Sequence, residues 1–332
     1  MYYAKYIKYK KKYESLIGGA ALELYKIGPK EYHFTFEKYL DINGATDMIF
    51  TDQGMIVITQ KGDVYLVGEE IRKQDYKLDP KFTSEDTEQG LLGIAKINDT
   101  IYLSYTIDDG SEGTSLVVEE LDGKRILQIH SPTKYHHGGH IVVHNNMLYL
   151  GTGDGGPQGD PNNHAQGDTL NGKMIQINPI NYEIKIIASG LRQPWIFSFD
   201  DQDRMWIGDV GWNKSESVKV IKDVNKFNNF GWNYYEGSLI NKPPPPNINF
   251  TKPIFEYPTS DKTGRAIIGG FFVDGAYIFA DYLGFVRAIK FIDGYWKEVG
   301  NDKFSGKIFS LAYDGKHIYI LADKGIYTLR EM

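Results

Sequence analysis

The chain has 332 residues, with 36 glycines, 24 tyrosines, no cysteine and a formal net charge of −6. Without cysteine it can form neither a disulfide nor a thiolate metal site, so any bound metal needs oxygen or histidine ligands. No apolar run reaches the ~18 residues that span a bilayer, and no apolar segment follows the basic N-terminal residues. We therefore expect a soluble protein without a cleaved signal peptide.

The first residues differ from the rest of the chain and predict a short helix. Apolar and aromatic side chains recur there at helical spacing, and lysines fill the positions between them (Tyr2, Tyr6, Tyr9, Tyr13 and Leu16; Lys5, Lys8, Lys10, Lys11 and Lys12). Gly18 and Gly19 end the pattern, which predicts a basic amphipathic helix within an N-terminal extension over residues 1–20. Because this extension is basic, the rest of the chain is more acidic than the net charge suggests. A general nucleic-acid-binding surface on the rest of the chain is therefore not expected.

The role of the extension stays open at this point. A solvated, frayed tail fits the sequence, and so does a tether to nucleic acid or anionic lipid, where each lysine contributes roughly 1 kcal/mol. The string KYIKYKKKYESL also resembles N-terminal segments of proteins from giant mimivirus-like viruses. That resemblance implies a location in the virion or the host cytoplasm, with other virion proteins as partners.

The remaining chain repeats one plan six times, with a turn rich in Asp, Asn or Gly, an apolar strand, a second turn and another strand. The repeats are residues 52–67, 97–121, 144–155 with 173–178, 201–211 with 217–222, 274–291 and 314–330. Their first apolar residues are Met55, Ile101, Leu148, Met205, Tyr277 and Ile318. The shorter intervals match the roughly 40–50 residues of a four-stranded propeller blade. We therefore predict an all-β fold, a six-bladed β-propeller over residues 32–332.

Two features refine this architecture. The longer intervals hold insertions, and residues 242–258 contain four consecutive prolines that exclude a strand interior, so we place this loop at the rim. The last repeat, 306–330, is expected to take a strand from residues 32–40 and so to close the ring. A β-sandwich or a parallel β-helix fits less well, because sandwiches lack six such repeats and β-helix coils are shorter.

Candidate functional residues lie in the connections, which a rigid ring gathers at one mouth. The segment YHHGGH at 135–140 holds three histidines just before a predicted inner strand, and its glycines permit close backbone approach. From the residues alone, a structural histidine, a metal ligand and a general base fit equally well. Arg192 in GLRQPW suits an ordinary surface ion pair. The tight loop GDVGWN at 208–213 has carbonyl groups that suit a hard cation.

Seven motifs in order resemble one protein family. They are EQGLLGIA (88–95), HHGGHIV (136–142), LYLGTGDGG (148–156) with DPNNHAQ (160–166), GLRQPWIFSFD (190–200), IGDVGWN (207–213), NFGWNYYEG (229–237) and GRAIIGGFF (264–272). Together they resemble the soluble PQQ-dependent aldose sugar dehydrogenases and the related Hedgehog-interacting-protein-like propellers, over about residues 40–330. The order of the motifs makes the match specific, since no single motif would suffice.

The resemblance implies a reaction and two catalytic residues. The reaction is the PQQ- and Ca²⁺-dependent oxidation of an aldose at C1, with a sugar and an electron acceptor as partners. His136 falls on the family's catalytic base, which takes the hydroxyl proton, whereas His137 falls on a variable position. Arg192 falls on the arginine that stabilises negative charge developing on the quinone oxygen.

The resemblance also implies a cofactor site. The backbone carbonyls of Gly211 and Trp212 fall on those that hold the Ca²⁺, which in turn binds PQQ. Glu88 falls on a polar residue that reaches toward the site, and Gln193 on a residue that contacts PQQ. The implied cofactor-binding residues are therefore Glu88, Gln193, Gly211 and Trp212, and the last two are also the implied metal ligands.

The chain departs from the family pattern at the cofactor site. Gln193 and Ile196 stand where relatives usually have asparagine and arginine, and Trp212 puts an indole where glutamine is common. These departures leave an alternative open, a catalytically inactive propeller that binds carbohydrate or serves as a virion structural or packaging protein. In that case Trp212, Trp195 and the segment 229–236 are candidates for a platform on which a sugar ring stacks.

Overall fold

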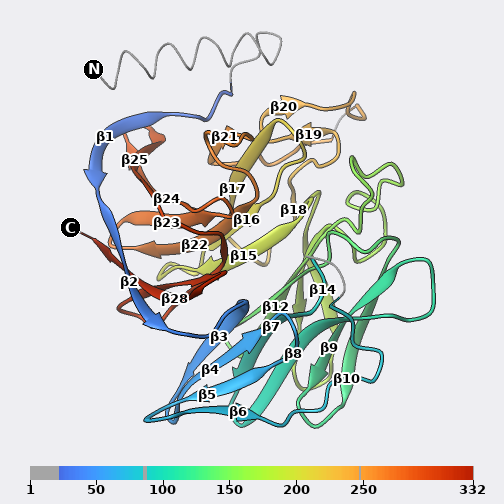
Figure 1. Cartoon of the computed structure of the whole chain (residues 1–332). Helices are drawn as coiled ribbons and strands as arrows, with labels where there is room; N and C mark the ends of the chain where they lie inside the picture. The colour runs from blue at the N-terminus through green and yellow to red at the C-terminus, as the bar shows by residue number, and fades with distance from the viewer. Residues whose placement is uncertain (1–21, 85–87, 247, 332) are drawn as a thin grey trace.

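The computed structural model describes residues 22–84, 88–246 and 248–331, and within them the chain forms strands, turns and loops. No helix in these ranges is long and apolar enough to cross a membrane. The strands form twisted sheets arranged around a common centre (Figure 1). The prediction of an all-β, six-bladed β-propeller is confirmed.

The predicted N-terminal extension, residues 1–20, lies outside the described residues. Its basic helix and its contacts with nucleic acid, anionic lipid or virion proteins therefore stay predictions. The chain packs against the propeller from Leu22 onward, before residue 32, where the domain was expected to begin, and Leu22 is itself buried.

The first three blades are antiparallel sheets of four consecutive strands, to which blade 3 adds one short parallel strand. Blade 1 contains β3 (Ala45–Thr51), β4 (Gly54–Thr59), β5 (Val64–Val67) and β6 (Ile71–Gln74). Blade 2 contains β7 (Leu91–Ile97), β8 (Thr100–Ile107), β9 (Thr114–Glu120) and β10 (Arg125–Ser131). Blade 3 contains β11 (Gly138–His144), β12 (Met147–Thr152), β13 (Lys173–Ile177) and β14 (Ile184–Ser189), with β18 (Asn228–Asn229) beside β14.

The other three blades follow the same plan with local additions. Blade 4 contains β15 (Pro194–Phe199), β16 (Met205–Asp209), β17 (Ser215–Ile221) and β21 (Phe255–Pro258). Blade 5 contains β22 (Ile267–Val273), β23 (Ala276–Asp281), β24 (Phe285–Ile292) and β25 (Tyr295–Lys303). Blade 6 contains β26 (Ile308–Tyr313), β27 (Ile318–Ala322) and β28 (Gly325–Glu331). The short hairpin β19 (Tyr235–Glu236) and β20 (Leu239–Ile240) lies in the connection between β17 and β21.

The first strand of each blade lines the centre of the ring. In chain order β3, β7, β11, β15, β22 and β26 each contact the next, and β26 contacts β3 again. The six residues that anchor the predicted repeats all lie in the second strand of a blade. The loops that lead into and out of these two strands are therefore brought together around the central channel.

Alternation along the strands builds one apolar core at each junction between blades. In β12, Leu148 and Leu150 pack between blades 2 and 3, whereas Tyr149 packs between blades 3 and 4. In β16, Met205 faces blade 3 and Trp206 faces blade 5. Because successive side chains of a strand point to opposite faces, an apolar strand is buried on both sides. This explains why the central strands are nearly continuous apolar runs.

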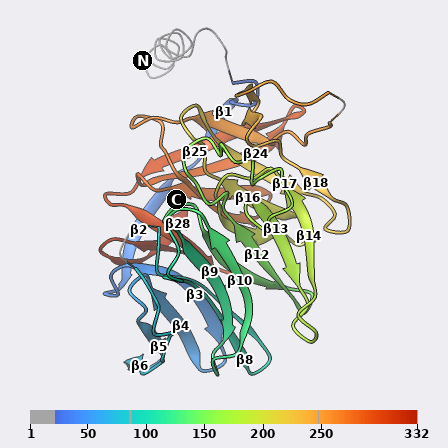
Figure 2. The same ribbon diagram turned by 90° about the vertical axis from the view of Figure 1, so that its right-hand side faces the viewer.

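The ring is closed by the N-terminal segment. β2 (Phe34–Leu40) pairs antiparallel with β28 and supplies the outer strand of blade 6, so the predicted closure by residues 32–40 is confirmed. β1 (Ile27–Tyr32) adds a parallel outer strand to blade 5 beside β25. Both N-terminal strands lie beside C-terminal strands in Figures 1 and 2. One continuous segment therefore fastens two neighbouring blades.

The predicted rim loop is shorter than expected. The four prolines at 243–246 lie outside all strands, but the last residues of the expected loop, Phe255–Pro258, form β21. Phe255 and Tyr257 are fully buried there against blade 5. The proline run marks the loop correctly, and the apolar residues that follow it complete blade 4.

Candidate functional site

His136 lies in the connection between β10 and β11, at the mouth of the ring. Its backbone has a positive φ of 55°, and its N–H donates to Glu88 Oε2 at 2.6 Å. Gly138 follows with φ of 70°, and a Cβ at Gly138 would lie 2.3 Å from the carbonyl oxygen of Gly151. Only glycine fits this turn, which brings His136 back over the end of β12.

A buried carboxylate orients the imidazole of His136. Asp154, just after β12, places Oδ1 at 2.6 Å from His136 Nδ1, and its Oδ2 accepts a hydrogen bond from Trp232 Nε1 at 2.8 Å. His136 is 4% exposed and Asp154 is fully buried. Because a carboxylate only accepts hydrogen bonds, the proton of the neutral imidazole lies on Nδ1.

Arg192, which lies just before β15, binds the other imidazole nitrogen. Its Nη2 lies 3.0 Å from His136 Nε2 and donates to Gln158 Oε1 at 2.9 Å, while Nη1 donates to the Gly211 carbonyl oxygen at 2.8 Å. Since a guanidinium only donates, His136 Nε2 is an acceptor. This is the tautomer that a general base requires.

The three histidines of YHHGGH have separate surroundings. His137 Nε2 lies 2.6 Å from Thr114 Oγ1 in blade 2, and His140 Nδ1 lies 3.2 Å from Asp47 Oδ2 in blade 1. Only His136 lies between a carboxylate and a guanidinium. In the described part of the chain no group of three His, Asp or Glu side chains could hold a metal ion.

A buried ion pair holds the backbone that carries Arg192. Asp209 Oδ1 accepts hydrogen bonds from the N–H groups of Arg192 at 3.0 Å and Gln193 at 2.9 Å. Its Oδ2 pairs with the ammonium group of Lys219, and both side chains are 4% exposed. A buried charge that loses its partner is costly, so this pair fixes the position of the Arg192 backbone.

Replacing Asp209 by asparagine should lower the free energy of unfolding by about 3–5 kcal/mol, because the ammonium of Lys219 is left buried without its counter-charge. Urea unfolding measures this change. Replacing Lys219 by methionine in the same chain should recover most of the loss. No recovery would assign the cost to the lost backbone contacts instead. As a control, Asp223→Asn, which breaks an exposed pair with Lys226, should change stability by less than about 1 kcal/mol.

The loop after β16 carries the two implied metal ligands, Gly211 and Trp212. The Gly211 N–H donates to Glu216 Oε2 at 3.0 Å. Burial, followed by the nearby carboxylate of Asp281, raises the pKa of Glu216 to about 7. Trp212 is 38% exposed. Gly211 therefore lies beside Arg192. The Glu216 carboxylate, which accepts a hydrogen bond from the Gly211 N–H, has a pKa near neutral.

The other implied cofactor residues lie around this cluster. Glu88 contacts the backbone of His136, as described above. Gln193 is buried, and its Oε1 accepts a hydrogen bond from the Gly138 N–H at 3.1 Å. The structure thus brings His136, Arg192, Glu88 and Gly211 into one connected set. Their catalytic and cofactor-binding roles stay predictions.

Several residues of the cluster were not singled out from the sequence. They are Asp154, Gln158, Asp209, Trp232 and Glu236. A signal existed for Asp154, because it lies within LYLGTGDGG directly after the second strand of blade 3, where strand ends meet the mouth. Trp232 and Glu236 lie in the segment 229–236, which the sequence indicated only as a candidate sugar platform. No signal exists for Gln158. The contacts of Gln158 with Arg192 and of Trp232 with Asp154 join segments far apart in the chain.

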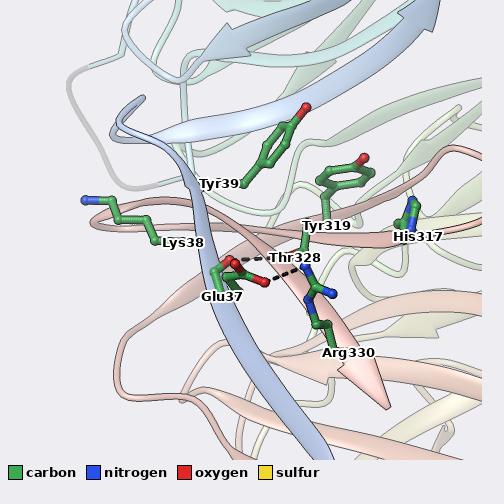
Figure 3. A pocket seen from close by; sticks show the side chains of 7 residues that line it. All are labelled: Glu37, Lys38, Tyr39, His317, Tyr319, Thr328 and Arg330. Carbon is green, nitrogen blue, oxygen red and sulfur yellow. Dashed lines mark hydrogen bonds and ion pairs between the residues drawn. The ribbon is translucent and has the colours of Figure 1, made fainter. Parts of the chain in front are cut away.

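A separate surface hollow lies on blade 6, between β2 and the strands β27 and β28 (Figure 3). It has a volume of about 220 Å³ and shares no residue with the His136 cluster. The rings of Tyr39 and Tyr319 meet edge to face, and Arg330 pairs with Glu37 at 2.5 Å. Arg330 is paired with Glu37, and no carboxylate contacts an imidazole among the lining residues. This hollow therefore lacks the carboxylate–imidazole–guanidinium arrangement of the central cluster.

A protein-family model matches most of this chain. Residues 44–278, about seven tenths of the chain, match the family described as Glucose / Sorbosone dehydrogenase. The chain belongs to this family. The family assignment made from the seven motifs is confirmed, and the matched residues include His136, Asp154, Arg192 and Gly211.

Curated relatives are longer than this chain. The HIPL2 protein of Arabidopsis thaliana is 30% identical over 55% of this chain, and the HIPL1 protein of the same plant is 28% identical over 69%. These matches cover 34% and 44% of the relatives. The chain therefore spans less than half the length of these two relatives.

Solved structures share the propeller fold. The PQQ-bound aldose sugar dehydrogenase from Streptomyces coelicolor has a TM-score of 0.68 at 18% identity, covering 92% of this chain and 99% of that one. The holo PQQ domain of pyranose dehydrogenase from Coprinopsis cinerea has a TM-score of 0.58 at 12% identity, covering 92% and 98%. At these identities the similarity shows the fold alone.

Proposed function

We propose that this protein oxidises the C1 hydroxyl of an aldose sugar with PQQ and Ca²⁺, and that His136 is the general base. The observation that carries the proposal is the position of His136, with Nδ1 on the buried Asp154 carboxylate and Nε2 on the Arg192 guanidinium. Membership of the Glucose / Sorbosone dehydrogenase family supports the reaction class. The PQQ-bound state of the Streptomyces coelicolor enzyme supports the cofactor.

His136, Asp154 and Arg192 have separate roles in the proposed removal of the proton. His136 Nε2 takes the proton of the C1 hydroxyl once Arg192 has turned from it toward the substrate or cofactor. Asp154 keeps the ring in the required tautomer and stabilises the imidazolium that forms. Arg192 supplies a permanent positive charge at the place where negative charge develops. Burial of the cluster strengthens both electrostatic effects.

The oxygen atoms around Arg192 suit a hard cation in their chemistry. The carbonyl oxygen of Gly211 and Gln158 Oε1 both converge on the Arg192 guanidinium, which is a cation. Calcium prefers such oxygen ligands. We propose that the carbonyls of Gly211 and Trp212 hold the Ca²⁺ and that Arg192, Gln193 and Glu88 contact PQQ. When bound, PQQ with its Ca²⁺ would supply the acceptor for the hydride that leaves C1.

Reconstitution of the full-length protein tests this proposal directly. Addition of PQQ and CaCl₂ should give bound PQQ, measured by its absorbance after gel filtration, and reduction of an artificial dye with a panel of aldoses. Removal of calcium by a chelator should abolish the activity. Absence of PQQ binding at micromolar concentrations overturns the proposal.

Replacing Arg192 by methionine should lower kcat by about 100-fold or more, because the positive charge at the site is lost. Arg192→Lys should lie between this variant and the wild type. Lysine keeps the charge, but one ammonium cannot reach His136, Gln158 and Gly211 together as the forked guanidinium does. Steady-state kinetics of the reconstituted enzyme measure both. Equal activity of Arg192→Lys and wild type would mean that the charge suffices without the fork.

A propeller that binds carbohydrate without oxidising it is the second candidate. The observation that favours it concerns the Arg192 guanidinium, which donates hydrogen bonds to His136 Nε2 and to the Gly211 carbonyl oxygen. Both the proposed base and one proposed calcium ligand are therefore occupied by Arg192. Isothermal titration separates the candidates. Sugar binding by a protein that takes up no PQQ supports the second candidate.

A further inference from the structure

Trp212 differs from the other candidate aromatic residues at the mouth of the ring. Trp195 donates its Nε1–H to the Phe309 carbonyl at 2.7 Å and packs in the core between blades. Trp232 is 2% exposed and is used to hold Asp154. Trp212 is 38% exposed. Of these three tryptophans, Trp212 is the most exposed, because Trp195 is partly buried and Trp232 is buried.

Short contact routes connect Trp212 with His136. Its neighbour Gly211 accepts a hydrogen bond from Arg192, which also contacts His136 Nε2. The Trp212 ring also meets the ring of Trp232 edge to face, with centroids 6.4 Å apart, and Trp232 binds the carboxylate that orients His136. The indole is therefore linked to the proposed base through one or two intervening side chains on either route.

The backbone of glycine 159 forms the floor under one edge of the indole. A Cβ at Gly159 would lie 3.2 Å from the ring atoms Cη2 and Cζ3 of Trp212. The preceding residue, Gln158, binds Arg192. The ring is thus packed against the same loop that contributes a polar group to the cluster.

A buried carboxylate holds the Trp212 backbone. Glu236 Oε1 accepts hydrogen bonds from the N–H groups of four consecutive residues, Trp212 to Ser215, at 2.9, 2.8, 2.6 and 3.1 Å. Glu236 is itself 2% exposed. The loop that carries the exposed ring is therefore fixed before any ligand arrives, which lowers the entropy lost on binding.

We infer that the Trp212 indole is the surface on which the sugar ring stacks, so that it determines which sugars the site accepts. A pyranose presents a face of C–H groups that packs on an aromatic ring, while its hydroxyls need polar partners. Arg192 and Gln158 bind each other, and each is next to a residue that borders Trp212, since Arg192 contacts the Gly211 carbonyl and Gln158 precedes Gly159. These two side chains would supply such groups. The inference rests on the proposed function, since the stacked ring must present C1 to His136.

Sugar binding to the full-length protein without added cofactor tests the inference. Isothermal titration with D-glucose, D-xylose and cellobiose should show at least tenfold weaker binding for Trp212→Ala than for wild type, and a change within about threefold for Trp212→Phe. Phe291→Ala, which removes a 61% exposed ring on blade 5, is the matched control and should bind as wild type does. Thermal unfolding checks that all variants are folded.

The remaining outcomes separate the stacking role from the proposed function. Unchanged sugar affinity in Trp212→Ala, or no binding of any probe by wild type, overturns the inference. PQQ affinity is measured separately by absorbance titration, and the stacking role predicts a larger loss of sugar affinity than of PQQ affinity in Trp212→Ala. A loss of PQQ affinity with unchanged sugar affinity would assign the indole to the cofactor. If wild type binds sugar through Trp212 but shows no PQQ-dependent turnover, the proposed function fails and the stacking role stands.

Discussion

Replacing His136 by alanine should lower kcat of the PQQ- and Ca²⁺-loaded protein by about 1,000-fold, within the usual range for removal of a general base. PQQ binding should change little, because the positive charge of Arg192 stays in place. Stopped-flow dye reduction measures the effect. His130→Ala, which removes a histidine on β10 with a half-exposed side chain, should retain full activity.

The variant Asp154→Asn tests the role of His136 as the base by changing which imidazole nitrogen carries the proton. The amide of asparagine can donate to His136 Nδ1, which would move the imidazole proton to Nε2, where Arg192 already donates. We expect kcat to fall at least 100-fold with a smaller change in KM. The pH dependence of kcat should shift as well, which a purely structural role of Asp154 would not produce. Wild-type activity of both His136→Ala and Asp154→Asn would exclude His136 as the base.

Deleting residues 1–40 should open the ring and lower the thermal unfolding midpoint by at least about 10 °C. The deletion removes β1 and β2 with the buried Tyr32 and Phe34, and the loss of each large aromatic side chain costs about 3–5 kcal/mol. A loss of this size lowers the midpoint by about 2 °C per kcal/mol in a large domain. β28 would also become an open edge prone to aggregation.

Two further variants keep this prediction decisive if the deleted chain does not fold. Phe34→Ala should lower the midpoint by several degrees, since the Phe34 ring packs between blades 5 and 6. Deletion of residues 1–16 leaves both closing strands in place and should leave the midpoint unchanged. Equal stability of all three variants and wild type would show that the ring does not depend on its N-terminal strands.

The repeats could be predicted because they depend on local pattern, and the closure followed from the last repeat lacking its outer strand. Apolar residues recur with strand periodicity, and turns follow at blade-length intervals, so each repeat specifies its own sheet. The start of the closing segment was harder to place. β1 (Ile27–Tyr32) is mostly exposed and has no apolar alternation, and it is a strand only because the edge of β25 is available. Similarly, β21 was assigned to a rim loop because the prolines before it hid its pairing with β17.

For the site, the sequence by itself determined the glycine turn at Gly138, the histidines before an inner strand and the order of motifs that indicates the family. The residues alone did not decide among the three histidines, and the family resemblance pointed to His136. The tertiary structure added the contacts of His136, which join the loop before blade 3 to Asp154 after β12 and to Arg192 at the start of blade 4. The same holds for the aromatic candidates, because the partial burial of Trp195 and the exposure of Trp212 depend on neighbouring blades. Strand periodicity is a property of adjacent residues. The partner of a buried polar group, by contrast, is set by which blades lie side by side.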